Sequence, residues 1–140
     1  MNARIKWVEN VMFVAESGTG HAIVLDGAPE GGGRNMGMRP MELMAMSVGS
    51  CSSYDVVTIL KKARQAVTSC EAEVTAERVD TTPAVFKSMH LHFKVAGREL
   101  SEKQVERAVE LSADKYCSAS IMLKNAGVLV THSFEISESI

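Results

Sequence analysis

Residues 40–62 read PMELMAMSVGSCSSYDVVTILKK, and we expect the rest of the chain to pack around this segment. Pro40 suits the first position of a helix, where its missing N–H is no loss and its fixed φ is already helical. No residue up to Lys62 forces the helix to end, although Gly49 is a weak point. Apolar side chains fall at nearly every angle around this helix, which indicates burial on all sides.

The composition is that of a globular chain with one core. The 140 residues carry a net charge of −2, and the basic residues are scattered, so nothing favours binding to nucleic acid. No apolar run approaches the roughly 20 residues that a membrane helix needs. Three cysteines without paired spacing do not form a secreted disulfide framework, and the N-terminus does not resemble a signal peptide. We therefore expect one domain over residues 1–140, soluble and cytoplasmic, with no nucleic-acid or membrane partner.

Alternating patterns predict strands on both sides of the long helix. Before it, residues 4–15 and 21–26 indicate a three-stranded antiparallel meander, followed by a flexible glycine-rich loop at 27–38. After it, residues 70–77 and 88–95 indicate a hairpin. A last strand over residues 128–136 shows the same alternation.

Two shorter helices are expected between the hairpin and the last strand. Ser101 and Gln104 form a capping-box pattern at the start of the first, and Gly127 closes the second, which follows a break near Cys117. The order of elements predicts an α+β fold with an antiparallel sheet packed on helices. Such a sheet covers only one face of the long helix, so we expect a homodimer in which two of these helices lie together.

Cys51 and Cys117 are the candidates for chemistry, since each lies on or beside a helix. The competing interpretation is structural, because a free cysteine commonly packs as a small buried apolar residue. Asp55 lies one turn after Cys51, and a carboxylate there disfavours a thiolate. Arg34 and Arg39 are the nearest cations in the sequence.

A set of motifs carries a resemblance to a known family. It comprises residues 40–46, the Gly49-Ser50-Cys51-Ser52 segment, the Cys117-Ser118-Ala119-Ser120 segment and the Thr131-His132 pair in the last strand. Together these motifs resemble the OsmC/Ohr family over essentially the whole chain. The resemblance implies an intertwined α+β homodimer with its sites at the subunit interface.

The resemblance also implies a reaction. Members reduce organic hydroperoxides with two cysteines that correspond to Cys51, the peroxidatic thiol, and Cys117, the resolving thiol. An external dithiol, lipoyl-type in well-known members, reduces the resulting disulfide, and no metal or organic cofactor takes part. This activity belongs to oxidative stress defence.

Several residues depart from the family pattern. Members with strong peroxidase activity carry two acids after the proline, and here the first is replaced by Met41, so that only Glu42 remains. Glu42 is nine residues from Cys51, which places it on the opposite side of a straight helix. The arginine expected in the N-terminal strands has no clear counterpart; Arg34 and Arg39 could each fold back over the thiol, and Arg39 and Glu42 are candidate site residues with the two cysteines. Ser118 stands where the family usually has a proline.

These departures motivate two other functions. A non-catalytic protein of the same fold would bind a small apolar ligand in the interface pocket, with the methionines at positions 36, 38, 41, 44 and 46 lining the pocket or filling the core. A cysteine–histidine acyl hydrolase would use His132, for which a hydrogen-bonded core histidine is the favoured alternative.

The remaining candidates have structural interpretations. Cys70 is expected to point into the core from its strand. His90 and His92 share one strand face, and an exposed polar face is favoured over a zinc site because no third ligand is evident.

Overall fold

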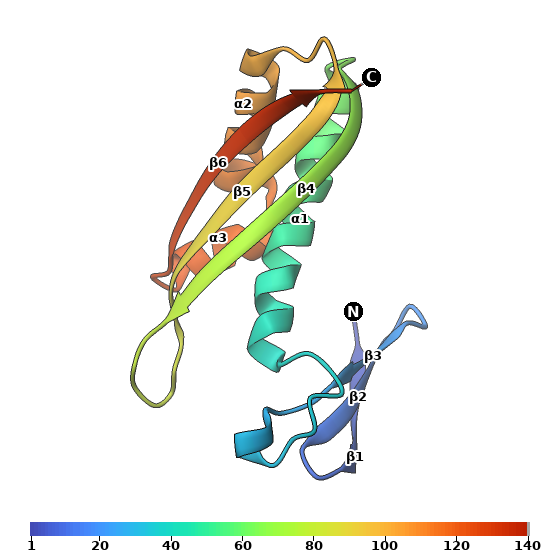
Figure 1. Cartoon of the computed structure of the whole chain (residues 1–140), viewed down its shortest axis with the longest axis vertical. Helices are drawn as coiled ribbons and strands as arrows, with labels where there is room; N and C mark the ends of the chain where they lie inside the picture. Colours follow the sequence, from blue (N-terminus) through green and yellow to red (C-terminus); the bar gives the residue numbers. More distant parts are fainter. Residues whose placement is uncertain (140) are drawn as a thin grey trace. The chain divides into compact units, whose positions relative to one another are not determined.

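The computed structural model describes residues 1–139. Within this range the chain forms three strands, a long helix, two more strands, a helical segment in three parts and a final strand (Figure 1). It divides into two compact units, Met1–Met44 and Ala45–Ile140. The expectation of one domain over residues 1–140 stays a prediction.

The first unit contains the expected antiparallel meander. Its strands are β1 (Ala3–Glu9), β2 (Met12–Ser17) and β3 (Ala22–Leu25), paired in the order β1-β2-β3. Facing pairs such as Trp7 and Phe13 hold the register of β1 on β2. The meander predicted from the alternating pattern is therefore confirmed.

The glycine-rich segment after β3 is fixed by one carboxylate. Asp26 is buried and accepts backbone N–H groups from Gly27 at 2.8 Å, from Arg34 at 3.0 Å and from Met36 at 3.0 Å. A short 3₁₀ turn, η1 (Pro29–Gly31), lies inside this loop. The flexibility expected of this loop stays a prediction, although a single side chain accepts three of its backbone N–H groups.

The long helix α1 (Pro40–Lys62) has the bounds expected from the sequence. Pro40 is its first residue, and the Glu42 carboxylate accepts the backbone N–H of Arg39 at 2.8 Å, which satisfies a donor at the helix start. Gly49 does not interrupt the helix. A Cβ atom there would lie 2.8 Å from a methyl group of Val74, so glycine permits close packing of the helix on a strand.

One side of α1 is buried, and the other is not. Its buried residues follow a spacing of about four and face the chain's own sheet: Val48, Gly49, Ser52, Val56 and Leu60. On the other side Met44, Met46 and Tyr54 are 45%, 53% and 73% exposed in the single chain. Burial on all sides is thus not achieved within one subunit.

By length and composition alone, α1 could cross a membrane. The expectation that no segment reaches this threshold is therefore wrong, because the serines and glycine near its centre lower its mean hydropathy too little. Val56 and Leu60 nevertheless lie fully buried within the second unit. The helix is accordingly a core helix, as in a soluble protein, and the cytoplasmic location stays a prediction.

The second unit contains a three-stranded sheet with the order β4-β5-β6. β4 (Ala66–Arg78) and β5 (Phe86–Arg98) form the expected antiparallel hairpin, whereas β6 (Leu129–Glu138) runs parallel to β5. The expectation of a wholly antiparallel sheet is wrong, because the helices between β5 and β6 carry the chain back before β6 begins. The helices pack on one face of this sheet (Figure 1), and β5 contributes Met89, Leu91, Phe93 and Val95 to the core.

The helical connection between β5 and β6 has three parts. It consists of α2 (Glu102–Leu111), the π-helical turn η2 (Ser112–Tyr116) and α3 (Ser118–Asn125). The expected capping box is wrong in its side-chain part: Ser101 is the N-cap, but the Gln104 N–H donates to the backbone oxygen of Ser101. The predicted break falls at Cys117, whose N–H bonds to Ser112, five residues back.

Candidate functional site

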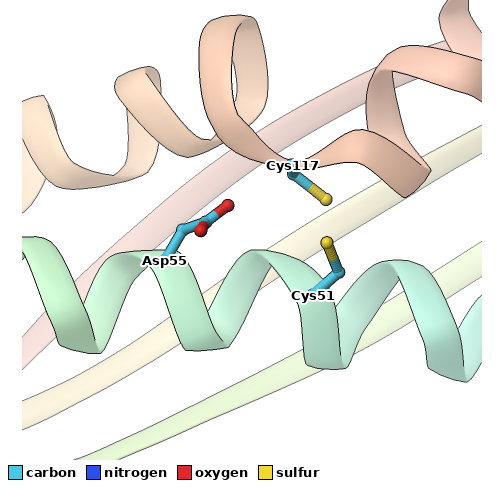
Figure 2. Close-up of side chains that lie close together, drawn as sticks. All are labelled: Cys51, Asp55 and Cys117. Atoms are coloured by element: carbon cyan, nitrogen blue, oxygen red, sulfur yellow. The ribbon is translucent and has the colours of Figure 1, made fainter.

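Two thiols and one carboxylate meet between α1 and the η2–α3 junction. The Sγ atoms of Cys51 and Cys117 and a carboxylate oxygen of Asp55 all lie within 4.8 Å of one another. Figure 2 shows the two sulfur atoms pointing toward each other, with Asp55 one turn along α1 from Cys51. The structure therefore brings together two cysteines that are 66 residues apart in the sequence (117 − 51).

The backbone at Cys117 explains how its thiol reaches α1. The π-helical turn ends there, and Cys117 takes an extended conformation with φ −71° and ψ 99° as the N-cap of α3. Its sulfur accepts the backbone N–H of Ser120 at 3.3 Å, the contact that an N-cap side chain makes with the N3 position. The side chain is thus held at the start of α3 and faces Cys51.

A second donor reaches the same sulfur from α1. The Ser52 hydroxyl donates to the Cys117 Sγ at 3.1 Å. Burial raises the pKa of the Cys117 thiol, the hydrogen bonds from Ser52 and Ser120 oppose this rise, and the neighbouring Cys51 adds to it. The net direction is upward, so the buried thiol is kept protonated more strongly than a free one, although it is supplied with donors suited to a thiolate.

Asp55 is positioned by a third serine. The Ser112 hydroxyl lies 3.3 Å from both the Asp55 Oδ2 and the backbone oxygen of Ser52. Among residues 1–139, Asp55 forms no ion pair with a lysine or arginine. The carboxylate therefore stands beside two thiols without a paired cation in the described part of this chain.

Two hollows border the site. One, with a volume of about 310 Å³, is lined by Asp55, Thr58, Ile59, Lys62, Leu111 and Tyr116. Its volume and mixed lining suit the organic part of a small molecule. The other, about 10 Å³, has room for one water molecule and is lined in part by Ser52, Ser112, Ser120 and His132.

His132 forms no hydrogen bond with either thiol within residues 1–139. It lines the small hollow, but within residues 1–139 its ring has no hydrogen-bond partner, so the expectation of a hydrogen-bonded core histidine is wrong. The Ser120 hydroxyl, in the same hollow, is the buried side-chain oxygen left without a partner among these residues. Among the described residues no base is hydrogen-bonded to a cysteine, so the structure gives no geometric support for an acyl hydrolase.

Arg39 and Glu42 lie together in the first unit. In addition to the bond between its N–H and Glu42, Arg39 directs its guanidinium to the Asn35 side-chain oxygen at 2.7 Å and to the backbone oxygen of Gly37 at 3.1 Å. Arg34, the other nearby cation, forms an ion pair with Glu9. A role for Arg39 and Glu42 toward the thiols stays a prediction.

The remaining candidates lie on strands of the second unit. Cys70 lies on β4 and is only half-buried, so it is not one of the fully buried core residues that were expected to include it. His90 bonds to Thr131 at 2.7 Å and to Ser133 at 2.8 Å, and His92 bonds to Ser133 at 2.8 Å. These histidines belong to a polar network across β5 and β6.

Sequence reasoning did not identify the three serines that surround the thiols. One available signal was the spacing Cys117-x-x-Ser120, which is the N-cap to N3 spacing at the start of a helix. The roles of Ser52 and Ser112 depend on the packing of η2 against α1, for which the sequence holds no local signal.

Comparisons with known proteins agree with this architecture. Residues 31–133 match the family described as "OsmC-like protein". The chain is 48% identical over 139 residues to "Protein YhfA" of Escherichia coli K12, covering 97% of this chain and 98% of that protein.

Solved structures share the fold. A structure from structural genomics superposes with a TM-score of 0.90 at 45% identity, covering 99% of this chain and 100% of the other. An organic hydroperoxide resistance protein OsmC of Legionella pneumophila, described as a predicted redox protein, has a TM-score of 0.70 at 17% identity, covering 96% and 95% of the two chains. At this identity the second likeness shows the fold alone.

Proposed function

The chain belongs to the OsmC-like family and is a close homologue of Escherichia coli YhfA, and from this membership we propose that it reduces organic hydroperoxides with Cys51 and Cys117. The observation that carries the proposal is the approach of the two sulfur atoms to within 4.8 Å. Structures at 17% identity that are named as organic hydroperoxide resistance proteins share the fold, and the proposal extends the reaction in their names to this chain.

The exposure of the two thiols supports their roles. Cys51 is half-buried and Cys117 is 0% exposed, so a substrate meets Cys51 first. We therefore assign Cys51 as the peroxidatic thiol and Cys117 as the resolving thiol. The cavity of about 310 Å³ beside Asp55 holds the organic group of the hydroperoxide.

The proposed reaction has three balanced steps. The Cys51 thiolate attacks the terminal oxygen of the hydroperoxide, the O–O bond breaks, and the alkoxide leaves as an alcohol after taking a proton, so that Cys51 becomes a sulfenic acid. The Cys117 sulfur then attacks the Cys51 sulfur and releases water, which forms the disulfide. An external dithiol reduces this disulfide by two thiol–disulfide exchanges and is itself oxidised.

Mass spectrometry of the intact protein tests the proposal. One equivalent of cumene hydroperoxide should produce a Cys51–Cys117 disulfide in the wild type and a sulfenic acid on Cys51 in Cys117→Ser. Cys70→Ser is the matched control, because its thiol lies on β4 away from the pair, and it should behave as the wild type. Absence of both oxidised products would reject the proposal.

Arg39 and Glu42 are assigned a supporting role in this proposal. Arg39 supplies the positive charge that stabilises the thiolate, and Glu42 fixes Arg39 through its backbone N–H. Arg39→Ala should slow Cys51 oxidation by about tenfold or more, with partial rescue in Arg39→Lys. Arg34→Ala is the matched control, since Arg34 pairs with Glu9. Equal rates in Arg39→Ala and Arg34→Ala would remove Arg39 from the site.

The same proposal includes a homodimer with its sites at the subunit interface. OsmC-like proteins are typically dimeric, and the exposed Met44, Met46 and Tyr54 of α1 give an apolar surface that a second subunit would cover. Light scattering during gel filtration should give twice the chain mass of 15.2 kDa. Tyr54→Glu should weaken the dimer, whereas a wild-type monomer at every concentration would contradict it.

Binding of a small apolar ligand without catalysis is the second candidate function. It is favoured by the upward direction of the Cys117 pKa and by the Asp55 carboxylate beside the thiols, which forms no ion pair among residues 1–139, since both disfavour thiolate chemistry. Native mass spectrometry of the purified protein should then detect a co-purified apolar molecule, and Cys51 should stay reduced with hydroperoxide.

A further inference from the structure

The three groups at the thiol pair are all ligands for a soft divalent cation. Within the described part of the chain, Cys51, Asp55 and Cys117 are the one set of three such residues whose donor atoms converge, with every pair of atoms inside 4.8 Å. In a tetrahedral zinc site with Zn–S bonds of about 2.3 Å, donor atoms lie about 3.6–3.8 Å apart. Small side-chain rotations would bring the set to this spacing.

The surroundings of the three donors match those of a metal site. Zinc ligands are usually held by outer hydrogen bonds that fix their orientation. Here Ser112 holds the Asp55 carboxylate at 3.3 Å, and Ser52 holds the Cys117 sulfur at 3.1 Å. Two of the three ligands are therefore already oriented by hydroxyl groups that cannot act as strong ligands themselves.

The charges at the site also favour a cation. A carboxylate beside two thiols repels a thiolate, and no lysine or arginine of residues 1–139 forms an ion pair with Asp55. Lys62 shares the neighbouring cavity with Asp55 but is not paired with it. A divalent cation would turn the repulsion among the three anionic ligands into attraction.

We propose that the reduced protein binds one zinc ion per chain through the Cys51 sulfur, the Cys117 sulfur and the Asp55 carboxylate, with a fourth position open. This revises the expectation of no metal. Binding converts both thiols to thiolates and releases two protons, so occupancy falls as the pH falls. The cavity of about 310 Å³ beside Asp55 gives an exogenous ligand access to the open position.

Zinc binding and disulfide formation exclude each other, because both use the same two sulfur atoms. Zinc would therefore hold the pair reduced, and oxidation of the pair would release the metal. This regulatory consequence rests on the proposed peroxidase function, whereas binding of zinc to the reduced chain does not. The two are separated by measuring metal binding without hydroperoxide and hydroperoxide reaction with a chelator present.

Cobalt substitution tests the site on the full reduced chain. Co²⁺ titration should produce a sulfur-to-cobalt charge-transfer band that saturates at one ion per chain and disappears when Zn²⁺ is added. The band should be lost in both Cys51→Ser and Cys117→Ser. Asp55→Asn and Ser112→Ala should each weaken binding by about tenfold or more. Cys70→Ser, whose thiol lies outside the site, should bind as the wild type.

Circular dichroism and a thermal melt of each metal-free variant establish that the loss of binding is not a loss of fold. No charge-transfer band in the wild type would overturn the proposal. A band that survives unchanged in Cys51→Ser or in Cys117→Ser, or that is lost in Cys70→Ser, would overturn it as well. Failure of zinc binding together with a normal peroxide-induced disulfide would reject the metal site and leave the peroxidase proposal standing.

Discussion

Cys117 is fully buried and Cys70 is half-buried, and the surroundings of the two thiols differ. Burial raises the pKa of both thiols. At Cys70, on β4, burial is the whole cause, whereas at Cys117 hydrogen bonds from Ser52 and Ser120 act in the opposite direction. The comparison shows that hydrogen-bond donors reach the sulfur atom of Cys117 and oppose the effect of burial on its pKa, whereas burial alone acts on Cys70.

The largest difference should appear when each thiol is removed. Cys117→Ser should lower steady-state turnover of hydroperoxide with a dithiol by at least about 100-fold, because Cys51 sulfenic acid then has no resolving partner in the chain. Cys70→Ser should stay within about twofold of the wild type. Consumption of the dithiol measures both, and equal losses in the two variants would remove the contrast.

Two serines of α1 test whether a hydrogen-bond donor changes the reactivity of the Cys117 thiol. Ser52→Ala removes a hydrogen bond that lowers the pKa of Cys117, so disulfide closure should slow by about tenfold and its pH profile should move upward. Ser50→Ala is the matched control, because its hydroxyl donates to the backbone oxygen of Ser47 within the same helix. Stopped-flow fluorescence across a pH series measures closure. An unchanged profile in Ser52→Ala would show that the hydroxyl does not act on the thiol.

Alkaline pH should destabilise the reduced fold through both thiols. A folded-state pKa raised above the ordinary value of 9.0 means that the folded protein holds the proton more tightly. The stability that each thiol contributes is then fully present at pH values below its ordinary pKa. It is lost as the pH rises through the raised pKa of the folded state. Urea unfolding at increasing pH should show this fall, with a smaller slope in Cys70→Ala and in Cys117→Ala. If neither variant reduces the dependence of the free energy of unfolding on pH, other titrating groups cause the loss of stability.

The smallest effect is expected for a substitution that keeps the volume of Cys70. Cys70→Val replaces a half-buried thiol by an apolar side chain of similar size on a strand, so the free energy of unfolding should change by less than about 1.5 kcal/mol. Peroxide-induced disulfide formation should be unchanged. A loss of disulfide formation in this variant would place Cys70 in the chemistry and end the distinction between the two thiols.

The sequence predicted those parts of the fold that depend on local periodicity. Pro40 and the unbroken run to Lys62 were sufficient for the bounds of α1, and alternation was sufficient for β5. The direction of β6 was not predictable, because an alternating strand has the same pattern in a parallel and an antiparallel pair. The exposure of one face of α1, where Tyr54 lies, agrees with the expectation that one sheet covers only one face of this helix, but the pattern of a helix does not say which chain covers the other face.

The candidate site was also predictable only in part from local sequence patterns. The motifs around Cys51 and Cys117 were enough to single out the two thiols. The convergence of Asp55 with them depends on the π-helical turn at Ser112–Tyr116, which sets where Cys117 emerges from the helical segment. A π-helical turn has no reliable sequence signature and is frequent at functional sites.

The carboxylate of Asp26 has a consequence for the range of conditions in which the loop before α1 keeps its shape. The N–H of Met36, followed by those of Arg34 and Gly27, lowers the pKa of this side chain below its ordinary value of 3.8, although burial acts against them. The three hydrogen bonds that Asp26 accepts are therefore fully formed above that value, and they are lost only when strong acid protonates the carboxylate. The conformation of the loop between β3 and α1 is thus insensitive to the mild acidification that cells experience. Arg39, at the end of this loop, therefore keeps its backbone position under such changes.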